Sequence, residues 1–436
     1  MEMYNLVSFC GLVLLLVFAW LCSSNKKSMN WRVVFWGTGL QIGFAAFIFL
    51  VPAGSKLFLV INDLVIQVLS SARAGTEFVF GRLAVQPGTE GANGETSLGF
   101  ILAFQGLATI IFFASLMGIL YFLRIMPLLI QGFAWIFTRL MRISGAESLC
   151  AASNIFVGAE SALTIRPYLD RMTKSELTTI LTAGMSTVAS SVMALYVLFL
   201  QQDFPTIAGH LVSASMLSAP AALVMSKILL PETETPETLG VDVKAEYSRE
   251  QNVLEAAING ANSGVKLVVG VTALLLAFLG LVALLNLIVG GIGGGINRLF
   301  SIEFDWTIKN LLGYLFYPFT LIIGIPVSDA WELSKVIGER LVVTEVTAYQ
   351  DLAVILKEGI LRHPRSAVIC TYALCGFAHV ASLAIFIGGI SALAPGRTTD
   401  LSKLGPRALL AATLACLMTA AVAGTFFNQG SILLGQ

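Results

Sequence analysis

Two carboxylates stand in stretches of the sequence that are otherwise apolar. Glu160 lies within residues 153–165, Ser-Asn-Ile-Phe-Val-Gly-Ala-Glu-Ser-Ala-Leu-Thr-Ile, and Glu345 lies within residues 342–346, Val-Val-Thr-Glu-Val. A charged side chain at membrane depth costs at least about 2.5–3.5 kcal/mol, so it is expected to face protein or water and to mark a solute pathway. Each carboxylate is therefore expected to accept hydrogen bonds from a polar solute. The alternative is that both only cap hairpin helices.

A second chemistry open to these residues is nucleophilic catalysis. Ser382 follows His379 by three residues on one predicted helix face, and with Glu345 it makes a conceivable Ser-His-Glu set. The sequence contains no nucleophile elbow, no phosphate loop and no zinc-ligand spacing. Six cysteines occur without a Cys-x-x-Cys pair and indicate small buried side chains. We therefore expect no enzyme and no cofactor.

The composition indicates what kind of protein must position these residues. The chain has 436 residues, of which 56% are hydrophobic and 12% are charged, and its mean hydropathy is +0.84. Soluble domains carry about 25% charged residues, so this chain has too much apolar surface for one soluble core. The formal net charge is zero, which provides no basic surface for nucleic acid. The sequence predicts an all-α integral membrane protein in contact with the lipid bilayer.

Apolar windows of about twenty residues predict the membrane spans. The first window is too long and continuous for a signal peptide, and no small-residue cleavage site follows it. The eight expected spans cover residues 4–22, 33–51, 99–123, 177–200, 205–228, 264–291, 366–393 and 407–428.

The basic residues of short loops predict the orientation. Three basic clusters fall on one side of the membrane if the N-terminus lies outside, and with eight spans the C-terminus lies outside too. The acidic linker at residues 231–252 then lies inside, as a solvated connector. We expect a multi-pass protein of the plasma (inner) membrane with both termini outside. The three clusters are Lys26, Lys27 and Arg32; Arg166, Arg171 and Lys174; and Arg397, Lys403 and Arg407.

Three further apolar regions do not fit as simple spans. Residues 54–75 mix polar and aliphatic side chains and suit a helix at the membrane interface. Residues 127–165 and 306–357 each begin with an amphipathic helix and continue into a stretch broken by polar residues, which predicts re-entrant hairpins. Glu147 and Asp329, where the two hairpins open, are expected to cap helix N-termini.

A short motif supports a repeat of these units. Gly184 to Ser190 and Gly376 to Ser382 both read Gly-x-x-x-Val-Ala-Ser, and each follows a predicted hairpin that contains one of the two carboxylates. The first unit enters the membrane from inside and the second from outside under the predicted orientation. An inverted repeat is typical of secondary transporters, whose solute sites lie near the midplane between the two halves.

At this point the chain resembles the concentrative nucleoside transporters in their bacterial eight-span form, and the resemblance covers nearly the whole sequence. The motifs that carry it are Gly75-Thr-Glu-Phe-Val-Phe-Gly81, Asn154-Ile-Phe-Val-Gly158 followed by Glu160, Glu255-Ala-Ala-Ile-Asn-Gly260 through Gly264-Val-Lys266, Gly324-Ile-Pro326 with Asp329, Glu345, and Leu374-Cys-Gly-Phe377-Ala378 with Ser382. Together these motifs are specific, although no single one is.

The resemblance implies a homotrimeric elevator transporter that carries a nucleoside with a cation, usually sodium and in some members a proton. It implies a substrate site whose residues contact the base and the ribose of the nucleoside. It also implies a sodium site made of oxygen ligands, which hard cations prefer. Because the sodium set contains no Asp or Glu, we favour sodium as the coupling ion. The implied substrate residues are Glu160, Val192, Glu345, Phe377, His379 and Ser382, and the implied sodium ligands are Asn154, Val157, Thr187 and Val188.

Three departures from the family pattern affect the substrate site. The pattern Gly-Gln-x-Glu is here Gly158-Ala159-Glu160, one residue shorter and without the Gln. The Asn before the second carboxylate is Thr344, and the Asn of the seventh span is His379. A neutral imidazole can donate and accept as an amide does, so His379 is expected to bind ribose and to make affinity depend on pH, in a direction that the sequence leaves open.

The same departures keep a related alternative open, a proton-coupled symporter of another ribosylated or nucleobase-like solute with the same fold. The expected organisation has four parts. Residues 1–126 form scaffold helices with the interfacial helix, 127–228 the first repeat unit with hairpin 1, 229–305 the cytoplasmic linker and a scaffold helix, and 306–436 the second repeat unit with hairpin 2.

Overall fold

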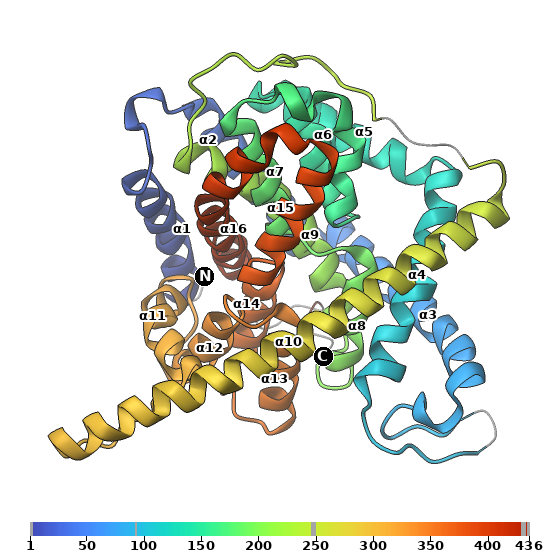
Figure 1. The fold of residues 1–436 in the computed structure, drawn as a ribbon, viewed down its shortest axis with the longest axis vertical. Helices are drawn as coiled ribbons and strands as arrows, with labels where there is room; N and C mark the ends of the chain where they lie inside the picture. The colour runs from blue at the N-terminus through green and yellow to red at the C-terminus, as the bar shows by residue number, and fades with distance from the viewer. Residues whose placement is uncertain (1–2, 92–93, 246–249, 429–432, 434–436) are drawn as a thin grey trace.

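The computed structural model describes residues 3–91, 94–245, 250–428 and 433, apart from the side chains of Ala159 and Glu160. Within these ranges the regular structure is helical, with two isolated β-bridges and no strand. The helices form one bundle with a single long helix across its face (Figure 1). The predicted all-α membrane fold is confirmed.

The first part of the described chain contains six longer helices and a set of shorter helical elements. The long helices are α1 (Met3–Leu21), α2 (Trp31–Leu50), α3 (Pro52–Phe80), α4 (Ala108–Phe122), α5 (Ile125–Met141) and α9 (Ile207–Leu229). The shorter elements are the π-helical turn η3 (Leu102–Leu107), α6 (Gly145–Asn154), the 3-10 helix η4 (Ala159–Arg171), α7 (Lys174–Ser186) and α8 (Ser190–Leu200).

The second part begins with the longest helix. It consists of α10 (Val253–Phe300), α11 (Ile308–Ile322), α12 (Val327–Glu339), α13 (Glu345–Lys357), α14 (Pro364–Leu374), α15 (Val380–Leu393) and α16 (Thr398–Phe426). Short 3-10 turns at Lys26–Ser28, Gly81–Leu83 and Pro395–Arg397 join some of the helices.

Eight segments of the described chain are long and apolar enough to cross a membrane. Seven of them match expected spans, but the span expected at residues 366–393 is wrong as a continuous helix, because it is divided into α14 and α15. The eighth segment is Pro52–Leu83, which contains α3. Its expected location at the membrane interface stays a prediction.

Two transmembrane segments are interrupted at mid-length. The first, Lys174–Leu200, breaks after Ser186 because Thr187 adopts an extended conformation, with φ −119° and ψ 162°. The second consists of α14 and α15 and breaks after Leu374. Gly376 in this break has φ +146°, a conformation that favours glycine. A Cβ at Gly376 would lie 2.8 Å from the carbonyl oxygen of Ser186, so the two breaks cross in direct backbone contact.

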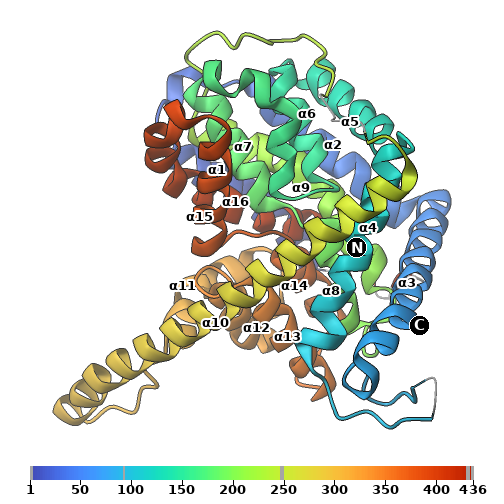
Figure 2. The ribbon, with the colours of Figure 1, turned by 45° about the vertical axis from the view of Figure 1, so that its right-hand side comes forward.

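The repeat unit is visible in the order of elements. An amphipathic helix, a hairpin and a broken helix follow one another as α5, α6–η4 and α7–α8, and again as α11, α12–α13 and α14–α15. The helices α6 and α12–α13 lie toward opposite ends of the bundle in both views (Figures 1 and 2). This arrangement fits two units of inverted direction.

Matching hydrogen bonds join hairpin to broken helix in each unit. The backbone N–H of Ser190, the first residue of α8, donates to the Phe156 carbonyl at 3.1 Å. The N–H of Val380, the first residue of α15, donates to the Leu341 carbonyl at 3.2 Å. Both acceptors lie two residues beyond the end of the first hairpin helix. These bonds give the structural register of the two units.

The Gly-x-x-x-Val-Ala-Ser motif does not follow this register. Gly184 lies two residues before the end of α7, whereas Gly376 lies two residues after the end of α14. The motif covers the break in both units, but its matching letters are not structurally equivalent. The repeat that it suggested is present, although it is supported by the elements rather than by these letters.

Helix α10 lies at the periphery and packs closely on α4. Added Cβ atoms at Gly118 and Gly260 would each lie 2.5 Å from a carbonyl oxygen of the opposite helix, so small residues bring the two backbones together. Most of α10 is exposed and strongly apolar, and it extends beyond the bundle (Figure 2). By contrast, α9 and α16 are largely buried and pack on each other.

Candidate functional site

Glu345 is the first residue of α13, just beyond the tip of hairpin 2. Thr344 is the helix N-cap, and its hydroxyl accepts from the N–H of Thr347. The Glu345 side chain is buried, and its Oε1 accepts a hydrogen bond of 2.7 Å from the Tyr196 hydroxyl on α8. The Tyr196 ring stacks on Tyr349 with centroids 4.3 Å apart. Glu345 is therefore held by a residue of the other repeat unit.

His379 ends the break between α14 and α15 and caps α15. Its Nδ1 accepts from the backbone N–H of Ser382 at 3.2 Å, so the ring proton of the neutral form lies on Nε2. Nε2 is 2.8 Å from both the Ser382 hydroxyl and Oε2 of Glu345. The structure thus brings together three predicted substrate residues, and fixes the tautomer of one.

The second oxygen of Glu345 remains available. His379 Nε2 lies 2.8 Å from Oε2 and pairs with it, but Oε2 accepts no hydrogen bond from any other group of the described residues. Each oxygen of a carboxylate can accept about two hydrogen bonds, so Oε2 keeps the capacity for a further donor beside His379. A solute hydroxyl or N–H group could supply this donor.

The same geometry argues against a catalytic triad. In a triad the nucleophile contacts one ring nitrogen of the histidine and the acid contacts the other. Here Ser382 Oγ and Glu345 both contact Nε2, while Nδ1 is occupied by a backbone N–H. His379 cannot transfer a proton from Ser382 with the assistance of Glu345 in this arrangement.

The predicted apolar residues lie beside this polar cluster. Val192 is buried on α8, one helical turn before Tyr196 and on the same face. Phe377 is half-buried within the break of the second unit and packs against the same hydrophobic core. They can form an apolar wall next to Glu345. The Glu160 side chain lies outside the described part, so its predicted contact with a base stays a prediction.

The four predicted cation ligands lie where hairpin 1 meets the break of the first unit. Asn154 is the last residue of α6, and its Nδ2 donates to the Cys150 carbonyl at 2.9 Å. Its Oδ1 is fully buried without a hydrogen-bond partner in the described chain. Val157 lies in the non-helical hairpin tip, and Thr187 and Val188 lie in the break. An orphaned amide oxygen beside unwound backbone suits a hard cation.

A cavity of about 930 Å³ opens beside hairpin 1. It lies between α4, α5, the early part of α10, the hairpin tip and the start of α8. Val157, Gly158 and Ser191 are among its lining residues, so the cavity reaches one of the predicted cation ligands, Val157, and the first turn of α8. A polar solute could approach the site from this side.

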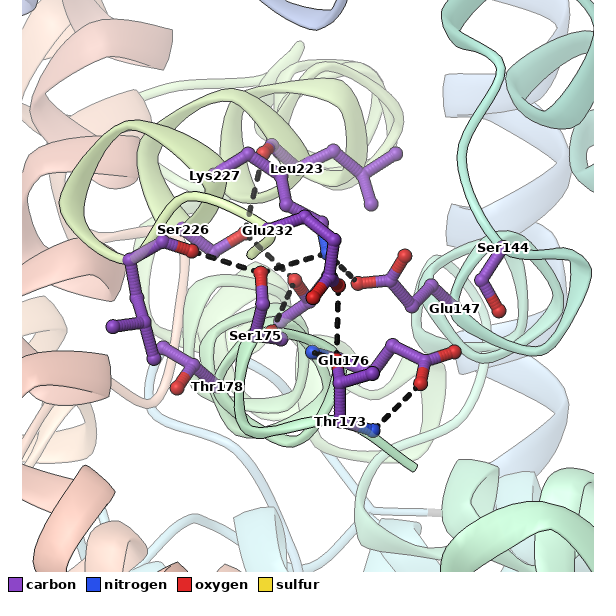
Figure 3. Close-up of polar contacts among 12 residues, drawn as sticks. Ser144, Glu147, Thr173, Ser175, Glu176, Thr178, Leu223, Ser226, Lys227 and Glu232 are labelled. Atoms are coloured by element: carbon purple, nitrogen blue, oxygen red, sulfur yellow. Dashed lines mark hydrogen bonds and ion pairs between the residues drawn. The ribbon is translucent and has the colours of Figure 1, made fainter. Parts of the chain in front are cut away.

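The base of hairpin 1 contains a buried ionic cluster (Figure 3). Glu147, in the first turn of α6, pairs with Lys227 of α9, which also donates to Ser175 Oγ at 2.9 Å and lies 3.4 Å from Glu232. Ser144, not Glu147, is the N-cap residue of α6. The predicted capping role is therefore wrong for Glu147, whose carboxylate anchors the hairpin to α9.

Asp329 also differs from its predicted role. It lies in the first turn of α12, but its carboxylate accepts from the backbone N–H groups of Arg362 and His363 and from Ser366 Oγ at 2.6 Å. These donors surround the start of α14. Asp329 thus fixes the broken helix against hairpin 2 rather than capping its own helix.

Comparison with known proteins finds similar sequences along most of the length of this chain. The chain matches the family descriptions "Na+ dependent nucleoside transporter N-terminus" over residues 10–83, "Nucleoside recognition" over 103–203 and "Na+ dependent nucleoside transporter C-terminus" over 210–424. An uncharacterized transporter of Haemophilus influenzae is 38% identical, with 98% of this chain and 99% of that protein covered.

Two further similar proteins are known by name, one from its sequence and one from a solved structure. Mouse solute carrier family 28 member 3 is 37% identical over 96% of this chain, which spans 58% of that longer protein. CNTnw, solved in an inward-facing substrate-bound state, is 35% identical with a TM-score of 0.86, over 97% of this chain and 98% of that one. The chain therefore belongs to the Na+-dependent, concentrative nucleoside transporter family, and it is a multi-pass membrane transporter rather than an enzyme.

Proposed function

We propose that this chain imports nucleosides by sodium symport. The observation that carries the proposal is the buried Glu345, whose Oε1 is held by Tyr196 while Oε2 pairs with His379 and accepts no other hydrogen bond in the described chain. A ribose hydroxyl supplies a further donor to this oxygen. The family name and the relatives support the nucleoside and the sodium ion.

The arrangement of side chains favours a ribosylated solute. Glu345 Oε2 accepts from one ribose hydroxyl, and the Ser382 hydroxyl, which bonds the same His379 Nε2 at 2.8 Å, bonds a second. Phe377 and Val192 offer the apolar wall on which a base packs. Glu160 accepts from the base, and the shortened Gly158-Ala159-Glu160 turn leaves it without the neighbouring Gln of the family pattern.

Sodium binding is proposed at Asn154 Oδ1, Thr187 Oγ1 and the carbonyl oxygens of Val157 and Val188. Thr187 Oγ1 donates to the Ala183 carbonyl at 2.9 Å, which leaves its lone pairs for a cation. The hairpin tip then contributes to the cation site and borders the solute site. Sodium that orders this tip increases nucleoside affinity, and by linkage the nucleoside increases sodium affinity.

Transport follows an elevator mechanism in a homotrimer of the inner membrane, with both termini outside. The repeat units at residues 127–228 and 306–436 move together, while residues 1–126 and 229–305 supply scaffold helices. The exposed apolar length of α10 supports a role at a lipid or protomer interface, because soluble surfaces rarely show so much apolar area.

A proton-coupled symporter of another ribosylated or nucleobase-like solute is the second candidate. His379 in place of the family Asn is the observation that favours it. Against it, the proposed cation ligands include no carboxylate that would bind a proton.

A thermal-shift screen of the purified protein tests the proposal and its alternative together. Nucleosides, free bases and ribose are added in sodium chloride or in choline chloride at equal ionic strength. We expect nucleosides to raise the melting temperature, and to do so more in sodium, because a ligand that binds only the folded state stabilises it by mass action. Stabilisation by bases alone, without any effect of sodium, would favour the second candidate.

A further inference from the structure

Arg340 is a buried arginine at the tip of hairpin 2. It is the C-cap residue of α12, and its side chain is 1% exposed. Its Nη1 donates to the carbonyl oxygen of Ala373, in the last turn of α14, at 2.5 Å. Arg340 forms no ion pair with a carboxylate of the described chain, and the carboxylate of the adjacent Glu339 pairs with Lys309 at 2.8 Å.

The Arg340 guanidinium lies at the C-terminal ends of two helices. Helix α12 ends at Glu339 and α14 ends at Leu374, so the guanidinium lies where two carbonyl-bearing C-termini meet. The C-terminus of each helix has a partial negative charge of about half an electron, which favours a cation within the last turn. A fixed positive charge at this junction stabilises both ends.

The first repeat unit has the same junction with different residues. There α6 ends at Asn154 and α7 ends at Ser186. The matching bonds from Ser190 to Phe156 and from Val380 to Leu341 place Arg340 at the register of Ile155, the residue after Asn154. Ile155 is apolar, so hairpin 1 supplies no cation from that position.

From this comparison we infer that the Arg340 guanidinium is a built-in cation, which occupies in the second unit the place that sodium occupies in the first. The inference rests on the proposed sodium site at Asn154. Both units therefore contain a junction that holds a positive charge, but only the junction of the first unit binds an exchangeable cation. Each protomer binds one such cation. It also follows that a small neutral residue at position 340 turns the second junction into an exchangeable cation site.

The test compares Arg340→Asn with Arg340→Lys, which keeps the positive charge. Melting temperature of the purified protein is measured against sodium concentration, with choline chloride holding the ionic strength constant. We expect Arg340→Asn to lose stability in choline and to recover it in sodium, and the Hill coefficient of its sodium response to rise from about 1 toward about 2, the number of sites. Arg340→Lys should behave as the parent does.

A matched control is Arg365→Asn. Arg365 is also buried and donates to backbone carbonyls, those of Gly324 and Gly424, but it does not lie at the tip of a hairpin. Its replacement should lower the melting temperature equally in sodium and in choline. If Arg340→Asn responds as Arg365→Asn does, Arg340 is an ordinary structural arginine and the inference fails.

The parent protein supplies a measurement that does not require any variant to fold. Equilibrium binding of radioactive sodium should give one ion per protomer, and two ions would overturn the inference. Binding of no ion would refute the proposed sodium coupling instead. One ion in the parent with no second ion in Arg340→Asn would overturn the inference while leaving the sodium coupling intact.

Discussion

The Tyr196 hydroxyl donates a 2.7 Å hydrogen bond to Glu345 Oε1, and the two residues belong to different repeat units. The carboxylate is therefore oriented only when both units are assembled. With Oε1 occupied by the tyrosine, Oε2 is the oxygen that faces His379, whose Nε2 also contacts the Ser382 hydroxyl. This bond accounts for how one buried acid is presented to a solute in a single orientation.

Tyr196→Phe should weaken nucleoside binding about tenfold or more. A hydrogen bond to a charged group contributes about 1.5–3 kcal/mol, and its loss also leaves Oε1 without a donor. The dissociation constant is measured by isothermal titration of the purified protein. Tyr349→Phe is the matched control, since it removes a hydroxyl from the stacked neighbouring ring that donates to the Thr371 carbonyl instead. Equal affinities for the two variants would contradict this role for Tyr196.

His379 should make nucleoside affinity decline as the pH is lowered. In the neutral form Nδ1 accepts from the Ser382 N–H and caps α15. Protonation of Nδ1 removes this acceptor and with it the cap, so the neutral ring is the binding form. Affinity is measured from about pH 8 to about pH 5.

His379→Asn is the variant that tests the origin of this pH dependence. Asparagine is a favoured N-cap residue, so α15 should stay folded and nucleoside binding should be retained. The variant should show little change in affinity over the same range. A parent whose affinity rises on acidification, or a variant with the parental profile, would exclude the neutral imidazole as the binding form.

Asn154→Ala and Thr187→Ala should each raise the sodium concentration for half-maximal nucleoside binding at least about tenfold, since changes even to the second shell of a metal site cost about 10–100-fold in affinity. Nucleoside affinity should fall in parallel at fixed sodium. Thr182→Ala is the control, because the Thr182 hydroxyl donates to a carbonyl one turn earlier on α7, as the Thr187 hydroxyl does. A control as impaired as the two variants would remove these residues from the cation site.

Lys227→Met should destabilise the protein by about 3–5 kcal/mol, because it leaves buried carboxylates without a partner. Lys227 is 4% exposed and Glu147 is 1% exposed. Arg171→Met provides the control, since its pair with Glu237 is largely exposed and such pairs contribute about 0–1 kcal/mol. Denaturant unfolding in detergent measures both. Similar stability of the two variants would show that the cluster in Figure 3 adds little.

Much of the architecture could be predicted from apolar length alone. Seven spans, both hairpins and the repeated order of elements follow from residues that must satisfy a lipid environment. The break between α14 and α15 was missed because the hydropathy of residues 366–393 stays high across Gly376, and hydropathy does not report backbone direction. Gly376 itself was the available signal.

Side chains that act through neighbours were harder to predict. Tyr196 lies on an apolar helix face and gives no sign in the sequence that it contacts an acid 149 positions away. Glu147 was expected to cap α6 because its partner Lys227 is distant in the chain. Glu345, His379 and Ser382 were predicted as a group from family motifs, but only the structure shows which ring nitrogen faces which partner.

The most direct test of the central claim is uptake of radiolabelled uridine and adenosine into proteoliposomes. With an inward sodium gradient, we expect at least one of them to accumulate unaltered above its external concentration, and an equal choline gradient to abolish accumulation. Glu345→Gln should fold but lose about 1.5–3 kcal/mol of nucleoside binding, because the amide carries no charge for the ribose hydroxyl. Accumulation that is indifferent to sodium, chemical conversion of the nucleoside, or undiminished uptake by Glu345→Gln would contradict the account.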